Sequence, residues 1–198
     1  MKKIGILGGT FDPVHIAHIE IAKAALEQFD LDEVRLMTGG IPPHKRDRII
    51  TPADIRFHMT ELASENTNGI VADDFELSKT EYTYTAKILT ELKELHPDWE
   101  IYFIIGEDSL YDFPKWYEPQ IIARNCVLLV YPRNKETDIK NLANERRKQF
   151  DADIRVIDAM VFDVSSTRIR ERVRDGLSIK GLVTPKVEMF INEKGLYR

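Results

Sequence analysis

The chain has 198 residues, of which 43% are hydrophobic, and its formal net charge is −5. This length and apolar content are enough to bury one full hydrophobic core, so we expect a single domain. The negative balance excludes a general nucleic-acid binder.

The cysteine content and the apolar runs bound the cellular setting. Cys126 is the one cysteine of the sequence, which excludes an intramolecular disulfide and fits a reducing compartment. We expect it to be a buried strand thiol rather than a catalyst. The longest apolar runs have the length of strands, so neither a signal peptide nor a membrane span is expected. These features predict a cytoplasmic protein with no membrane partner, and they leave a homodimer open.

Apolar strands alternate with helical periods along the chain. Strands are predicted at residues 2–7, 33–38, 70–75, 100–105, 126–131 and 153–158. Helices are predicted after the first strand, at 52–65 with Pro52 in the first turn, from Thr83 to the stop at His96-Pro97, and at 137–149, 166–175 and 185–193. The apolar stripe of the Thr83 helix is expected to contain Tyr84, Ile88, Leu92 and Leu95.

This alternation predicts βαβ units with right-handed crossovers. Strands such as 101–105 are apolar throughout, as a sheet covered on both faces requires. We therefore expect an α/β fold, a Rossmann-like doubly wound parallel sheet with helices on both faces. Residues 1–198 are assigned to one domain, with a helical part at about 164–198 packed on it. That part carries a net charge of +4 against −9 for the remainder, which indicates a local anion site.

The first strand runs directly into Gly8-Gly9-Thr10-Phe11-Asp12-Pro13, and His15 and His18 follow where a helix should begin. Glycines let the backbone approach a ligand, and a helix start offers unpaired N–H groups to an anion. Two imidazoles at i and i+3 can donate to the same phosphate chain. The run is neither a P-loop nor a dinucleotide fingerprint. Two alternatives are a metal site, with Asp12 as a third ligand, and a purely structural histidine pair.

Further motifs follow the other predicted strands. The second, fourth, fifth and sixth strands run into Thr38 to Lys45, Gly106 to Asp108, Tyr131 to Arg133, and Val164 to Arg170. Because ligands of a doubly wound sheet bind beyond the carboxyl ends of its strands, we expect these motifs to meet at one edge. Alternatively, Asp108 could cap a short helix that begins near Ser109, and Val164 to Arg170 could be an ordinary capped basic helix.

The run from Gly8 to His18 resembles the T/H-x-x-H motif of the nucleotidyltransferase superfamily, which includes adenylyl- and cytidylyltransferases. Val164 to Arg170 resembles the I-S-S-T-x-I-R motif of the same superfamily, with valine for isoleucine. Ala17 departs from the pattern, since the family usually has glycine there. The resemblance implies that His15 and His18 act on the ATP phosphates. It implies further ATP-binding residues at Gly8, Gly9, Thr10, Phe11, Gly106, Asp108, Ser165, Ser166, Thr167, Arg168 and Arg170.

Pro42-Pro43-His44-Lys45, Thr83-Tyr84-Thr85 and Trp116-Tyr117 resemble one branch of this superfamily, the bacterial nicotinate-nucleotide adenylyltransferases. The resemblance covers essentially the whole chain. It implies a catalytic Lys45 on a phosphate, Trp116 stacked on the pyridine ring, and the Tyr117 amide on its carboxylate. The proposed mononucleotide site also contains Thr10 and Thr85. Arg133 could bind a phosphate there, or it could be an ordinary surface arginine. An electron-poor ring suits an indole face.

The implied reaction joins ATP and nicotinate mononucleotide and releases pyrophosphate, with Mg²⁺ carried by the ATP phosphates and no protein metal site. The attacking phosphate is already an anion, so no protein base is needed. Rival hypotheses are another acceptor, namely nicotinamide mononucleotide, phosphopantetheine or a cytidylyl substrate, and a non-catalytic nucleotide sensor. An RNA-binding synthetase-like domain is disfavoured by the acidic charge.

Overall fold

Six parallel strands form the central sheet of the computed structural model, which describes residues 1–40, 50–79, 83–132, 138–160 and 162–198. The strand order is β3-β2-β1-β4-β5-β6, so the direction of winding reverses between β1 and β4. This confirms the predicted Rossmann-like, doubly wound α/β fold. The strands are β1 (Lys2–Gly9), β2 (Glu33–Thr38), β3 (Ile70–Asp73), β4 (Trp99–Gly106), β5 (Val127–Tyr131) and β6 (Ile154–Val156).

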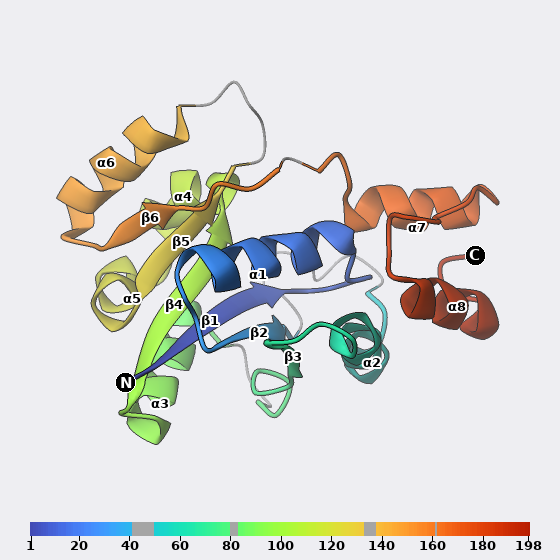
Figure 1. Cartoon of the computed structure of the whole chain (residues 1–198), viewed down its shortest axis with the longest axis horizontal. Coiled ribbons are helices and arrows are strands. Elements are labelled where there is room, and N and C mark those ends of the chain that lie inside the picture. The colour runs from blue at the N-terminus through green and yellow to red at the C-terminus, as the bar shows by residue number, and fades with distance from the viewer. Residues whose placement is uncertain (41–49, 80–82, 133–137, 161) are drawn as a thin grey trace.

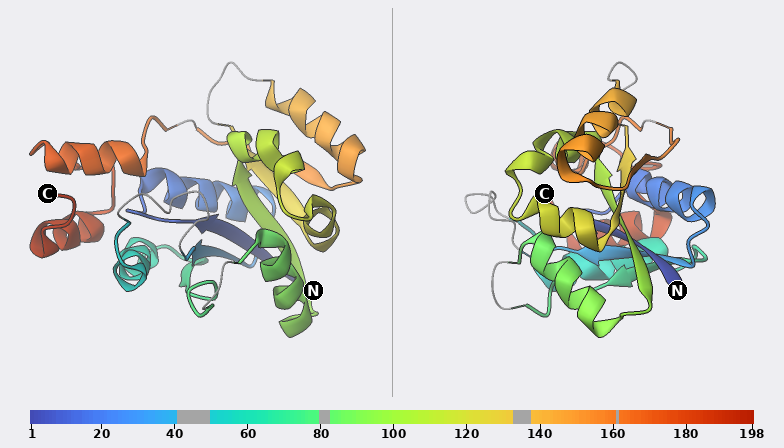
Figure 2. Two further views of the ribbon diagram at one scale, coloured as in Figure 1. Left: turned by 180° about the vertical axis from the view of Figure 1, so that it is seen from behind. Right: turned by 90° about the vertical axis from the view of Figure 1, so that its left-hand side faces the viewer.

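Helices cover both faces of this sheet (Figures 1 and 2). They are α1 (Ile16–Gln28), α2 (Ala53–Ser64), α3 (Thr85–Leu95), α4 (Glu107–Asp112), α5 (Pro119–Asn125), α6 (Ile139–Phe150), α7 (Ser166–Arg174) and α8 (Pro185–Lys194), with a 3₁₀ turn η2 at Phe113–Lys115. One apolar cluster joins the sheet to α1, α2, α7 and α8, and a second joins it to α3, α4, α5 and α6. Burial on both faces explains why the central strands are continuously apolar.

The strands lie within two residues of the predicted bounds, and β2 matches them. Helix α3 differs more, in its packing. It begins at Thr85, so Tyr84 is the extended residue before its first turn and is 42% exposed. Leu95, in its last turn, is 57% exposed. The predicted stripe was therefore wrong at both ends, because the strip that faces the sheet is Ala86, Ile88, Leu89 and Leu92. His96 ends the helix as predicted.

Two short elements after β4 depart from the prediction. Helix α4 begins at Glu107 with Gly106 as its N-cap, so Asp108 lies inside the first turn and does not cap a helix at Ser109. Helix α5 was not predicted, because seven residues are too few for a helical period to stand out. It starts after Glu118 in the left-handed region (φ 47°), with Pro119 in its first turn. Similarly, Pro52 is the N-cap of α2 and lies outside its first turn.

The C-terminal segment with α7 and α8 packs beyond the carboxyl end of β1, next to the turn that follows this strand. In Figure 1, α7 lies beyond the first turn of α1, and α8 lies beside α2. The Ile16 N–H donates to the Leu182 carbonyl at 3.0 Å, and the Ser166 hydroxyl donates to the Pro13 carbonyl at 2.8 Å. These contacts join the end of the chain to the first turn after β1.

Cys126 is buried immediately before β5, as predicted in outline. Its thiol donates to the Ile122 carbonyl at 3.3 Å, and burial raises its pKa to about 12. A thiol with this pKa is not a nucleophile at neutral pH. Across the described ranges, no helix combines the length and the apolar character that crossing a membrane requires.

Candidate active site

The turn that follows β1 is shaped by contact between Phe11 and Gly9. Phe11 has φ of 49°, is buried, and lays its ring over Gly9. A Cβ atom at Gly9 would lie 2.6 Å from that ring, so the turn itself requires glycine at this position. A Cβ at Gly8 would meet only the Phe103 ring, at an ordinary 3.9 Å. The described protein atoms therefore leave room at Gly8 for a ligand to approach the backbone, as the sequence predicts for the glycine turn.

The two histidines of the motif lie together at the start of α1. His15 is the N-cap residue and is 8% exposed, and its backbone N–H donates to His18 Nδ1 at 3.1 Å. The two imidazole rings stack with centroids 3.7 Å apart. Because Nδ1 of His18 accepts a hydrogen bond, the neutral ring carries its proton on Nε2. Nε2, the donor atom of this tautomer, therefore lies on the opposite side of the His18 ring from the His15 N–H.

A cavity of about 300 Å³ separates this turn from the start of α7. It brings together eight of the predicted residues from the two distant motifs: Thr10, Phe11, His15, His18, Ser165, Ser166, Thr167 and Arg170. The remaining lining residues are Asp12, Ala17, Ile21, Ile50, Tyr131, Pro132, Met160, Phe162 and Val164. The predicted meeting of the first and last motifs is therefore present in the fold.

The first turn of α7 faces this cavity with its backbone ordered by capping. The Ser165 hydroxyl accepts from the backbone N–H of Arg168 at 3.2 Å, which makes Ser165 the N-cap. Arg170 donates from Nη1 to the Asp12 carbonyl at 2.7 Å. Arg168 instead forms an ion pair with the exposed Asp163 at 2.6 Å and does not line the cavity. The helix start therefore presents Arg170, and not Arg168, to the cavity.

A second group of predicted residues lies over the other face of the sheet and does not line this cavity. Trp116 packs against Phe113 and Phe103, with centroid distances of 5.7 and 6.5 Å. Tyr117 stacks on Tyr84 at 4.4 Å, next to Thr85 in the first turn of α3. The Phe103 ring would lie 3.9 Å from a Cβ atom at Gly8. Phe103 therefore connects this aromatic group to the end of β1.

The motif Gly106 to Asp108 lies at the carboxyl end of β4. Gly106 ends β4 next to β5, and a Cβ there would lie 3.1 Å from the Tyr131 hydroxyl. Asp108 is exposed in the first turn of α4. The remaining predicted residues, Lys45 and Arg133, lie outside the described residues.

Several residues at the site were not singled out from the sequence. Met160 and Phe162 line the cavity from the connection between β6 and α7, where no pattern marks them. Arg56 is 1% exposed in the first turn of α2 and donates to the carbonyls of Thr10 and Gly39. Arginines are mostly exposed, so the sequence alone places Arg56 at the surface. Only the tertiary packing shows that it is buried.

The alternative of a metal site at the histidines finds no support in the side chains around them. In the part of the chain that the structure describes, there is no group of three or more His, Cys, Asp or Glu residues that could hold a metal ion. The Asp12 carboxylate, considered as the third ligand, accepts from Tyr197 and from the Thr51 N–H. Among the described residues, the pair therefore lacks the ligand set of a structural zinc site.

Comparison with known proteins agrees with this architecture. The Cytidylyltransferase-like family model matches residues 6–172. A relative from Lachnoclostridium phytofermentans, named "Probable nicotinate-nucleotide adenylyltransferase", is 36% identical over 199 residues and covers both chains fully. One of the same name from Clostridium botulinum (strain Loch Maree) is 39% identical over 197 residues, 98% of each chain.

Solved structures share the fold. The Plasmodium falciparum nicotinic acid mononucleotide adenylyltransferase complexed with NaAD has a TM-score of 0.82 at 24% identity, over 100% of this chain and 98% of its own. The same enzyme complexed with APC has a TM-score of 0.80, with the same coverage. Together with the full-length sequence relatives, the family match identifies the chain as a member of the nicotinate-nucleotide adenylyltransferase family, within the Cytidylyltransferase-like proteins.

Proposed function

We propose that this protein transfers the adenylyl group of ATP to nicotinate mononucleotide, giving nicotinate adenine dinucleotide and pyrophosphate. The observation that carries the proposal is the cavity at which His15 and His18 face the start of α7. It lies at the carboxyl edge of a doubly wound sheet, where such folds bind nucleotides. The names of the full-length relatives support the choice of reaction and of acceptor.

The chemistry asks the protein for positioning and positive charge. An oxygen of the mononucleotide phosphate attacks the α-phosphorus of ATP, and the bond from that phosphorus to the bridging oxygen of the β-phosphate breaks. The nucleophile is already an anion at neutral pH, so no proton has to be removed. His15 and His18 would donate to the α- and β-phosphates as charge develops on them.

The start of α7 suits the leaving pyrophosphate. Ser165, Ser166, Thr167 and Arg170 all line the cavity. A helix N-terminus stabilises an anion through its unpaired N–H groups and its dipole. We propose that Ser165, Ser166, Thr167 and Arg170 hold the β- and γ-phosphates. Arg168 would have to leave Asp163 to reach them.

The acceptor would occupy the aromatic group on the other face of β4. Trp116 is partly buried and could offer its indole face to a pyridine ring. Thr85 and the backbone of Tyr117 are proposed as uncharged donors to its carboxylate. Tyr117 follows Trp116 in the chain and stacks on Tyr84, the neighbour of Thr85. Asp108 is proposed as an acceptor for ribose hydroxyls at the end of β4. Lys45 stays assigned to a phosphate by the sequence resemblance, and Arg133 is proposed as a further contact of the mononucleotide phosphate.

We propose that Mg²⁺ enters with ATP and is carried by phosphate oxygens and water. Among the described residues that line the cavity, the acidic one is Asp12, and its carboxylate already accepts from Tyr197 and Thr51. We therefore propose that the ion is held mainly by the phosphates rather than by the described side chains of the cavity wall. The metal would neutralise phosphate charge and leave orientation to the protein.

Pyrophosphate release in the presence of ATP and Mg²⁺ tests the proposal directly. Nicotinate mononucleotide and nicotinamide mononucleotide are compared at equal concentrations. We expect strong release with the nicotinate substrate and much less with the amide, since a site built for one polar group rejects another. Release with neither acceptor despite ATP binding would refute the assignment and favour a nucleotide sensor.

A further inference from the structure

The penultimate residue of the chain reaches into the turn after β1. The Tyr197 hydroxyl donates to Asp12 Oδ1 at 2.7 Å, a contact between residues 185 positions apart. Its ring packs on the core cluster under α1 and α2, and its hydroxyl lies 4.0 Å from the Met59 sulfur. Burial and the Asp12 charge both raise the pKa of Tyr197, so the phenol stays protonated and remains a donor at neutral pH.

Asp12 is the residue through which several elements hold the turn. It is 6% exposed, and its second carboxylate oxygen accepts from the Thr51 N–H at 3.4 Å. Its backbone carbonyl accepts from Arg170 at 2.7 Å. Asp12 directly follows Phe11, whose positive φ bends the chain, and it precedes His15 by three positions. The placement of its side chain therefore bears on the direction in which the turn enters α1.

Arg56 stabilises the same turn through hydrogen bonds to backbone carbonyls. It donates to the Thr10 carbonyl at 2.6 Å, to the Gly39 carbonyl at 2.8 Å and to the Thr51 carbonyl at 2.9 Å. Burial lowers the pKa of Arg56, and the charges of Asp12 and Glu76 oppose that shift. Arg56 also donates to the Gly40 carbonyl at 3.5 Å. A buried guanidinium that binds carbonyls after both β1 and β2 fixes the ends of these strands relative to each other.

We propose that Tyr197 is a positioning residue for the phosphate site and acts through Asp12. Its hydrogen bond holds the Asp12 side chain, which keeps Thr10 and His15 oriented toward the ATP phosphates. Tyr197 does not line the cavity itself, so its effect reaches the substrate only through the turn. The inference builds on the proposed function, since it assigns the turn to ATP.

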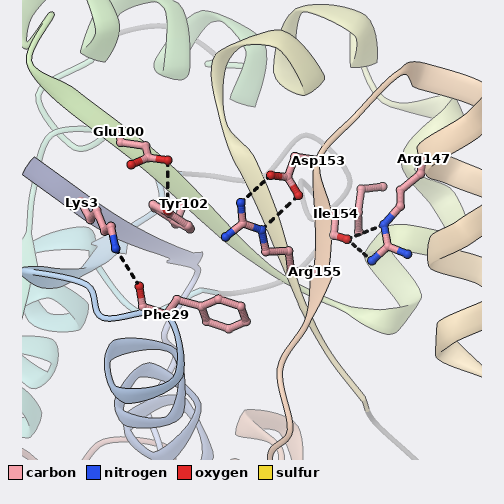
Figure 3. A network of polar contacts seen from close by, with 8 residues as sticks. All are labelled: Lys3, Phe29, Glu100, Tyr102, Arg147, Asp153, Ile154 and Arg155. Atoms are coloured by element: carbon pink, nitrogen blue, oxygen red, sulfur yellow. Dashed lines mark hydrogen bonds and ion pairs between the residues drawn. The ribbon is translucent and has the colours of Figure 1, made fainter. Parts of the chain in front are cut away.

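The test replaces the phenol with a phenyl ring and uses a matched control at a second tyrosine. In the Tyr197→Phe variant the ring is kept and the hydrogen bond to Asp12 is lost. The control is Tyr102→Phe, because the Tyr102 hydroxyl also donates to a carboxylate, that of Glu100 at 3.0 Å. Figure 3 shows this second pair near the Asp153–Arg155 ion pair, and none of these four residues lines the cavity.

We expect the Tyr197→Phe variant to lose about tenfold in kcat, with the KM for nicotinate mononucleotide nearly unchanged. The Tyr102→Phe control should keep kcat within about twofold of the parent while its melting temperature also falls. Circular dichroism gives the folded fraction of each variant. If kcat per folded molecule is the same in both variants and the parent, Tyr197 is structural only and the inference is overturned.

A double variant tests whether Tyr197 acts through Asp12. If it does, Tyr197→Phe slows the Asp12→Ala variant no further, because the shared partner is already gone. Additive losses would overturn the route through Asp12. If Asp12→Ala does not fold, the comparison of Tyr197→Phe with its control still decides.

Binding of a non-hydrolysable ATP analogue separates this inference from the proposed reaction. Calorimetry should give a Kd about fivefold weaker for Tyr197→Phe than for the parent and the Tyr102→Phe control. If the parent protein shows no pyrophosphate release, the proposed reaction fails, yet this Kd comparison still tests the positioning role. Equal analogue affinities in all three proteins would overturn it.

Discussion

The tautomer of His18 is set by a backbone contact. Because the His15 N–H donates to Nδ1 of His18, the neutral imidazole presents its proton on Nε2. The edge of the ring contacts Phe11 with centroids 4.9 Å apart, which limits its rotation. A donor with a fixed direction costs little ordering when a phosphate binds.

The first prediction concerns this donor. His18→Ala should lower kcat by about a hundredfold or more, because a preorganised donor to the developing charge is removed. His58→Ala is the control, since His58 is an exposed residue of α2 paired with Glu61. Pyrophosphate release under saturating substrates measures both. Near-parental turnover in His18→Ala would remove His18 from the phosphate site.

Trp116 differs from His18 because it also packs in the protein. Its ring contacts Phe103 and Phe113, so loss of the indole affects stability as well as any ligand. We predict that Trp116→Ala raises the KM for nicotinate mononucleotide more than the KM for ATP, since the ring is proposed to stack on pyridine. Steady-state kinetics with each substrate varied in turn measure the ratio.

Trp99→Ala gives the comparison for Trp116→Ala. Trp99 is 7% exposed at the start of β4, where it stacks on His96 with centroids 3.8 Å apart. Its loss should lower the melting temperature and leave the ratio of the two KM values unchanged. The same change in both KM values for Trp116→Ala would mean that Trp116 acts only in packing.

At the scale of the element, the start of α7 depends on one capping side chain. Ser165 satisfies the Arg168 N–H, and Ser166 ties the helix to Pro13. We predict that Ser165→Ala lowers the free energy of unfolding by about 1 kcal/mol and raises the KM for ATP, because the first turn frays. Ser165→Thr keeps a capping hydroxyl and should restore both quantities. Urea unfolding and ATP titrations measure them, and an unchanged KM in Ser165→Ala would separate the cap from the phosphates.

The elements also differ in how well the sequence marks them. Long helices with caps and stops, such as α6 (Ile139–Phe150) and α8 (Pro185–Lys194), were predicted to within two residues at each end. Helix α5 was missed, because a seven-residue helix after a left-handed residue has neither a long period nor an ordinary cap. Tyr84 and Leu95 were placed in the core of α3 by period alone, yet both lie at helix ends where the sheet no longer covers them.

At the scale of the whole molecule, Glu76 couples stability to pH. Its carboxylate accepts from the Gly40 N–H at 3.2 Å, and burial raises its pKa above the ordinary 4.5. The hydrogen bond from Gly40 and the charge of Arg56 only partly oppose this rise. In the unfolded chain the carboxyl ionises near pH 4.5, whereas the folded protein retains the proton to a higher pH. Stability contributed at this residue is therefore lost as pH rises from about 4.5 through the folded pKa.

The variant Glu76→Gln tests this linkage, because an amide oxygen can still accept from Gly40 and carries no charge. We predict that the difference in free energy of unfolding between Glu76→Gln and the parent moves in favour of the variant as pH rises above about 4.5. Denaturant unfolding at a series of pH values measures the difference. A difference that does not vary with pH would contradict the buried state of the carboxyl.

The sequence alone determined the strand–helix alternation, the doubly wound class, the family motifs and the residues of the two motifs that meet at the cavity. These signals are local, because a hydrophobic period, a glycine turn or a helix cap each depends on a few neighbouring residues. Tertiary structure alone decided which residues support those motifs. Arg56 binds carbonyls of two different turns, and Tyr197 reaches Asp12 across 185 positions. Such contacts depend on how distant segments pack, and no local pattern encodes them.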